Sequence, residues 1–68
     1  MATQTIKLAI LLGNARRDLA RHDSDQWSSL VWDHACKLYE RHGAALIEAL
    51  IAEGSNEAHR LADSLLAS

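Results

Sequence analysis

The stretch from Ser24 to Glu53 most constrains the fold, because it carries more apolar surface than one helix needs for a single core. At about 100° per residue around a helix axis, one face collects a first apolar stripe. Its members are Trp27, Leu30, Val31, Leu38, Ala45 and Ala49. A second apolar stripe lies about 100° away and consists of Trp32, Tyr39, Leu46 and Leu50. The pattern therefore predicts a helix that is covered on two sides.

The second stripe can be covered by another helix of the same chain, by a second copy of the chain, or by a different partner. Two aromatic side chains bury ~150 to 250 Å² each, which corresponds to roughly 10 kcal/mol of gross apolar transfer. We predict an isologous homodimer across the long helix, because a two-fold dimer covers the same patch on both copies. Which stripe forms the core stays open, so the predicted dimer or core residues come from both stripes: Val31, Leu38, Leu46 and Leu50.

The length of 68 residues predicts one small domain, residues 1–68. A domain of this size buries only ~60% of the surface of its unfolded chain, so it gains from oligomerisation. The single cysteine, Cys36, cannot form an internal disulfide and is typical of a reducing compartment. Hydrophobic residues make up 49% of the chain, which has three glycines and no proline, and this composition favours an all-α fold.

Helix boundaries follow from capping residues and glycines. A first helix is predicted over roughly residues 5 to 22, capped by Thr3 or Thr5. Its buried stripe is predicted to consist of Leu8, Leu12, Ala15 and Leu19, broadened by Ile6 and Ile10. Gly13 lies within this helix and marks either a close approach of another helix, which we favour, or a weak point of the helix.

The second helix is predicted to begin near a capping box formed by Asp23 and Gln26. Gly43 follows cations and could stop this helix, but no capping residue follows it, so we predict a continuous or kinked helix to Glu53. Gly54 is predicted to end it, and Ser55 or Asn56 to cap a short third helix. That helix carries one apolar face, made of Ala58, Leu61, Ala62, Leu65 and Leu66. The predicted fold is thus two principal helices and a short C-terminal one.

The side chains do not assemble a recognisable catalytic or metal-binding motif. Asp18 and His22 have the i, i+4 spacing of two metal ligands on one helix face, but no second pair completes a site. Cys36 and the serines lack a nucleophile motif. We therefore predict a protein without enzymatic activity, metal or other cofactor.

The charge and hydropathy of the chain restrict its partners. The net charge is −2, and the absence of a basic excess argues against nucleic acid or an anionic membrane as the main ligand. The apolar run LAILLG is too short for a secretory signal, and no run approaches the ~20 apolar residues of a membrane span. These features predict a cytoplasmic protein.

A DNA-binding helix-turn-helix regulator of a phage or plasmid is the alternative function. Short helices joined by tight turns are its architecture, and Arg16, Arg17 and Arg21 could contact phosphates. The candidate recognition helix, however, bears carboxylates that would face the phosphate backbone, among them Asp33, Glu40 and Glu48.

Tyr39 is predicted to lie at the margin of the second stripe, because Lys37, Glu40 and Arg41 beside it are charged. Tryptophan and tyrosine are frequent in interface hot spots, and an aromatic ring at such a margin can pack while its polar group stays in water. The predicted partner-binding residues are Arg16, Arg17, Trp32, Tyr39 and Glu40. For the arginines, a solvated helix end is the plainer interpretation.

Two segments, TIKLAILLGNARRDL (residues 5–19) and WDHACKLYERHG (residues 32–43), together with the all-helical pattern, resemble the small anti-quorum-sensing proteins of Mu-like Pseudomonas phages. The resemblance implies a helical homodimer that acts in the cytoplasm of a bacterial host. It implies binding to a LuxR-class quorum-sensing activator, whose DNA binding is blocked, and inhibition of the ATPase of type IV pilus assembly. Carboxylates such as Asp33 and Glu40 suit the approach of an acidic protein to a basic DNA-binding surface.

Overall fold

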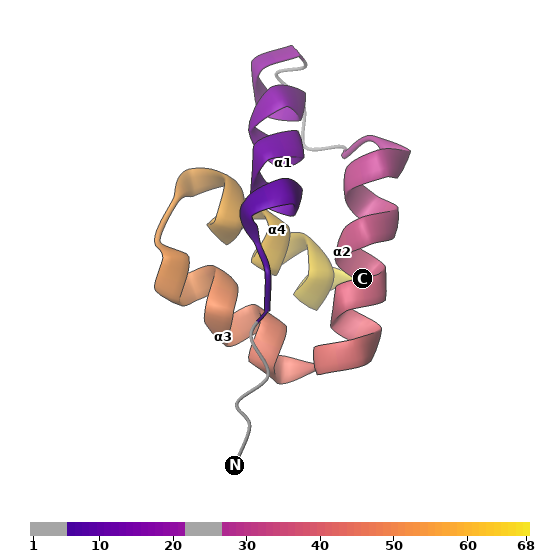
Figure 1. The fold of residues 1–68 in the computed structure, drawn as a ribbon, viewed down its shortest axis with the longest axis vertical. Helices are drawn as coiled ribbons and strands as arrows, with labels where there is room; N and C mark the ends of the chain where they lie inside the picture. Colours follow the sequence, from indigo (N-terminus) through magenta and orange to yellow (C-terminus); the bar gives the residue numbers. More distant parts are fainter. Residues whose placement is uncertain (1–5, 22–26) are drawn as a thin grey trace.

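The computed structural model describes residues 6–21 and 27–68, and every regular element within these ranges is an α-helix (Figure 1). The helices are α1 (Ala9–Arg21), α2 (Ser29–His42), α3 (Ala44–Glu53) and α4 (Asn56–Ala67). The all-α prediction is confirmed, although four helices take the place of the predicted three. The predicted caps at Thr3 or Thr5 and the Asp23–Gln26 capping box lie outside the described residues. No helix in the described ranges has the length and apolar character needed to cross a membrane.

Gly43 divides the predicted long helix in two, so the prediction of a continuous helix to Glu53 was wrong. Its φ of 59° and ψ of −135° lie in a region that is essentially restricted to glycine. The N–H of Gly43 donates to the carbonyl of Tyr39 at 2.7 Å and closes α2, while the N–H of Leu46 donates to the carbonyl of Gly43 at 3.0 Å in the first turn of α3. Cations followed by glycine therefore stop the helix even without a side-chain cap for the next one.

The boundary between α3 and α4 is the predicted one. Gly54 adopts the left-handed conformation with φ of 80° and ends α3. Ser55 then caps α4, because its side chain accepts a hydrogen bond from the N–H of Ala58 at 3.3 Å. This local signal is read correctly from sequence because each residue acts on its own neighbours.

Helices α2 and α4 hold the domain together, since each contacts the other three helices. In Figure 1, α4 passes behind α1 and lies between α2 and α3. All four helices contribute to one buried apolar cluster, which consists of Leu11, Leu12, Ala15, Val31, Ala35, Leu46, Ile47, Leu50, Ala58, Leu61, Ala62 and Leu65. The last helix is thus a central packing element rather than a minor addition.

In the folded chain, the two predicted apolar stripes do not form two separate faces of one helix. Leu46 and Leu50 of the second stripe have 0% of their surface exposed within the single chain, whereas Leu30 of the first stripe is 65% exposed. Ala45 is exposed, and Trp27 precedes α2 rather than lying on it. The break at Gly43 changes the direction of the chain, so helical phases on its two sides cannot be combined. At Leu46 and Leu50, the cover comes from the chain itself.

Helix α1 packs through Leu11, Leu12 and Ala15, while Ile10 is 73% exposed. The prediction that Ile10 broadens the buried stripe was therefore wrong. The expected close approach at Gly13 was also wrong. Apart from its two neighbours in the chain and the backbone of its own helix, no heavy atom of the described residues lies within 4 Å of the position that a Cβ would occupy there.

Polar contacts fix the start of α2 against α1 and α4. The carboxylate of Asp18 on α1 accepts a hydrogen bond from the N–H of Ser28 at 2.8 Å. The Ser28 hydroxyl caps α2 by accepting from the N–H of Val31 at 3.4 Å. The indole N–H of Trp27 donates to Oγ of Ser64 on α4 at 3.0 Å. The bonds to Asp18 and Ser64 thus tie the start of α2, which carries the candidate site, to α1 and α4.

Candidate functional site

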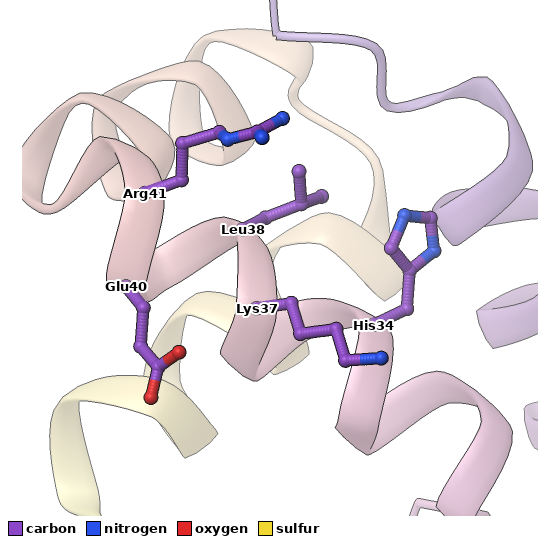
Figure 2. Close-up of a pocket in the computed structure, with 5 residues that line it drawn as sticks. All are labelled: His34, Lys37, Leu38, Glu40 and Arg41. Carbon is purple, nitrogen blue, oxygen red and sulfur yellow. The ribbon is translucent and has the colours of Figure 1, made fainter.

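A stripe of apolar and basic side chains runs along one exposed side of α2. It consists of Leu30, His34, Lys37, Leu38 and Arg41, which we call the α2 stripe. Positions separated by four, seven, eight and eleven residues share one side of an α-helix. Lys37 and Arg41 are exposed, whereas His34 and Leu38 are partly buried. In Figure 2, the Leu38 side chain lies between those of Arg41 and His34, while Glu40 extends in a different direction.

The α2 stripe borders two adjoining hollows, which we call together the α1–α2 groove. One hollow, of about 630 Å³, lies against the N-terminal end of α1 and is lined by Lys7, Leu8, Ala9, Ile10, His34, Leu38, Arg41 and His42. The other, of about 580 Å³, is lined by His34, Lys37, Leu38, Glu40 and Arg41 (Figure 2). Because His34, Leu38 and Arg41 line both hollows, the two hollows adjoin along the stripe.

The groove has the opposite charge to the protein as a whole. Lys7, Lys37 and Arg41 line it against the single carboxylate of Glu40, although the chain carries a net charge of −2. The apolar part consists of Leu8, Ile10 and Leu38. The surface therefore combines an apolar floor with a predominantly basic rim.

Trp32 and Tyr39, predicted to bind a partner, are partly buried and pack against the hydrophobic core. Helical geometry places both on the far side of α2 from the α2 stripe. Val31 has 0% exposure, so it lies in the core together with Leu46 and Leu50, whereas Leu38 is only partly buried and lines the groove. Of the predicted site residues, only Leu38 and Glu40 therefore line it.

Arg16 forms an intramolecular ion pair instead of standing free at a helix end. Its Nη2 and Nε atoms lie 2.7 Å and 3.0 Å from Oε1 of Glu57 at the start of α4. The hydrogen bonds from Arg16, followed by the backbone N–H of Glu57 itself, hold the pKa of the Glu57 carboxyl below its ordinary value. Arg17 is exposed on α1 and does not line the groove. No local pattern could have paired two residues that are 41 positions apart.

Asp18, considered above as half of a metal-binding pair, is 7% exposed and accepts the N–H of Ser28. Its position thus has a structural explanation, and His22 lies outside the described residues. Within the described ranges, no group of three or more His, Cys, Asp or Glu side chains could hold a metal ion. Cys36 is a free, partly buried thiol.

The sequence contains the α2 stripe, but assigning Leu30 to the core concealed it. The signal that could have revealed the stripe is the recurrence of cations at helical spacing around Leu30 and Leu38, since a core face would not carry Lys37 and Arg41.

Comparisons of the chain with protein-family models, with curated proteins and with solved structures gave no match.

Proposed function

We propose that this protein is a non-enzymatic inhibitor that acts by binding another protein, with the α1–α2 groove as its contact surface. The observation that carries the proposal is the grouping of exposed apolar side chains with cations. A single exposed leucine is ordinary on a protein surface. Here Leu30 and Ile10 are 65% and 73% exposed, and the partly buried Leu38 shares the α2 stripe with Leu30 and the groove with Ile10. An apolar strip bordered by charges is the arrangement that binds amphipathic helices.

The resemblance to phage anti-quorum-sensing proteins supplies the identity of the partner in this proposal. The partner is a LuxR-class activator in the cytoplasm of the bacterial host, and its DNA binding is blocked; the type IV pilus assembly ATPase is a second partner. Exposed carboxylates support this choice, because Asp33 and Glu40 lie beside the α2 stripe on the same helix. They would meet the basic DNA-binding surface of the activator while the groove holds another segment of it.

A homodimer remains part of the proposal, but its seam differs from the one that the sequence predicts. Leu46 and Leu50 are fully buried within one chain and cannot form it. The seam would instead use an apolar side chain that remains exposed outside the groove, Ile51 on α3, which is 54% exposed. Sedimentation velocity across a range of concentrations tests this, and a monomer throughout the micromolar range would contradict it.

The inhibitory function is tested with a purified LuxR-class activator bound to fluorescent promoter DNA. Addition of the protein should release the DNA and lower its fluorescence anisotropy, while calorimetry detects a complex of the two proteins. An activator that stays on its DNA and gives no binding heat at a large excess of the protein would contradict the proposal. The same titration without the activator provides the control for direct effects on DNA.

Direct DNA binding is the second candidate, and one observation favours it. Glu40 extends in a different direction from Lys37 and Arg41 in Figure 2, so its carboxylate does not stand among the cations of the α2 stripe. The apolar floor of Leu8, Ile10 and Leu38 argues against it, since phosphates offer nothing for that floor to contact. A salt-dependent shift of labelled DNA by the protein alone would establish this second function.

A further inference from the structure

We propose that the segment bound in the α1–α2 groove is an acidic amphipathic helix of the partner protein. This inference rests on the proposed function and deepens it by naming the chemistry of the contact. The apolar side of the helix meets the leucine and isoleucine side chains, and its carboxylates meet Lys7, Lys37 and Arg41.

The apolar side chains of the groove, together with Leu30 of the adjoining α2 stripe, match the repeat of an amphipathic helix. Leu30 and Leu38 are eight residues apart on α2, which corresponds to about 12 Å at 1.5 Å per residue. A helix with apolar residues at i, i+4 and i+7 presents side chains over about two turns, or ~10 Å. Ile10 on α1 provides a contact on the other side of the groove. Two turns of a partner helix therefore suffice to cover the exposed apolar surface.

The charge of the groove selects an acidic segment. Three cationic side chains line it against one carboxylate, so glutamate or aspartate in the bound segment is attracted and lysine or arginine is repelled. The groove is open, and no buried polar side-chain atom among the described residues lacks a hydrogen-bond partner that a small ligand could supply. Small-molecule sites normally enclose most of their ligand and orient it through such groups. A protein segment fits these features better.

A second copy of this chain is a poorer occupant than a different protein. Helix α3 carries the exposed carboxylates of Glu48 and Glu53, which suit the basic rim. Its larger apolar side chains, Leu46, Ile47 and Leu50, are however buried in the core of their own chain, and Ile51 alone is a large exposed one. The single side chain of Ile51 cannot cover both Leu30 and Leu38, which are about two turns apart on α2.

The test uses the full chain and a fluorescein-labelled helical peptide of about 16 residues with leucines at i, i+4, i+7 and i+11 and glutamates on the opposite face. A control peptide keeps the leucines and replaces every glutamate with lysine. Fluorescence anisotropy should show at least about tenfold tighter binding of the glutamate peptide, because the groove attracts one charge pattern and repels the other. Added salt should weaken this preference.

Matched variants locate the binding surface. Arg41→Glu and Arg21→Glu reverse the same charge in the last turn of α2 and of α1, respectively, but only Arg41 lines the groove. Leu30→Ser and Leu66→Ser each remove an exposed leucine, and only Leu30 lies in the α2 stripe. Arg41→Glu should weaken binding about tenfold and Leu30→Ser about fivefold, while the two controls bind as wild type. Circular dichroism verifies that all four variants are folded.

Four results would overturn the inference: equal binding of both peptides, no binding of either, equal effects of Arg41→Glu and Arg21→Glu, or displacement of the glutamate peptide by duplex DNA. The activator-release assay separates this inference from the proposed function. If wild type and Arg41→Glu release DNA from the activator equally well, only the assignment of the groove fails. If wild type binds the glutamate peptide but does not affect the activator, the proposed function fails and the chemistry of the groove stands.

Discussion

At the scale of single residues, Gly13 is a position where the helix can be improved. It lies inside α1, and no heavy atom of the described residues outside its own helix backbone would contact an added Cβ. Gly13→Ala should therefore raise the free energy of unfolding by about 0.5 to 1 kcal/mol, because alanine loses less conformational freedom on folding. Urea denaturation followed by circular dichroism measures this. Gly54→Ala is the control and should be destabilising, since φ at Gly54 is 80°.

A substitution of Tyr39 distinguishes a role of this side chain in core packing from a role in partner binding. The sequence suggests a partner contact at a stripe margin, but its ring packs against the core on the side of α2 away from the groove. We expect Tyr39→Ala to lower the free energy of unfolding by about 2 to 4 kcal/mol, with binding of the glutamate peptide unchanged once the protein is folded. Thermal melting and anisotropy on the same variant decide this. A stable variant that no longer binds would restore the binding role.

Glu57 makes stability depend on pH. Its carboxyl has a lowered pKa because Arg16 donates hydrogen bonds to it, so the folded state favours the ionised form. This contribution is fully present above the pKa of the unfolded chain and is lost as pH falls through the lower folded pKa. Glu57→Gln should lack that part of the acid dependence, measured by urea denaturation between pH 7 and 3. Since the Arg16 side chain is 71% exposed, the difference should be about 1 kcal/mol or less. An unchanged acid profile would show that the pair has no net effect.

At the scale of helices, α3 belongs to the core of a single chain. Leu50 has 0% exposure without any second copy, so Leu50→Ala should cost about 2 to 5 kcal/mol through the lost side chain and the cavity. The loss should be independent of protein concentration, whereas a residue in a dimer seam would show a concentration-dependent melting temperature. Melting curves over a hundredfold range of protein concentration test this. A loss that grows on dilution would place Leu50 at an interface.

The helices were predictable from sequence where the signal is local. The helical class, the Gly54–Ser55 boundary and the buried positions Leu12, Ala15 and Leu61 all follow from capping and periodicity. Gly43 was misjudged because residues that follow it have high helix propensity, and propensity alone does not reveal a turn of the chain. Leu30 was misassigned for a different reason: it lies within α2, where the cations Lys37 and Arg41 share its side of the helix and mark that side as exposed.

Contacts between helices could not be predicted in this way. Asp18 with Ser28, Arg16 with Glu57 and Trp27 with Ser64 join residues 10, 41 and 37 positions apart. Such pairs leave no periodic trace in one sequence. The groove likewise depends on contacts between helices, because its two walls come from the N-terminal end of α1 and from α2. Its basic and apolar residues can be identified in the sequence, but the sequence does not show that they lie close together in the fold.

At the scale of the whole molecule, α2 and α4 each contact the three other helices, so no helix is an independent unit. The groove lies on α1 and α2, whereas the ion pair of Arg16 and Glu57 and the bond from Trp27 to Ser64 attach these helices to α4. A destabilising substitution in α4 should therefore alter the groove, although α4 does not line it. Loss of binding in an α4 variant needs a stability measurement before it is assigned to contact.

The single residue between α2 and α3 also decides which chain completes the fold. Gly43 lets α3 and α4 return onto α1 and α2 of their own chain. In Gly43→Ala the positive φ is disfavoured, and a straight helix would carry α3 and α4 away to another copy, a three-dimensional domain swap. We expect this variant to form intertwined dimers that exchange subunits slowly, measured by sedimentation and by mixing differently labelled protein. Gly13→Ala should keep the wild-type assembly state, and a Gly43→Ala variant that also keeps it, with only a lower melting temperature, would show that the turn tolerates alanine.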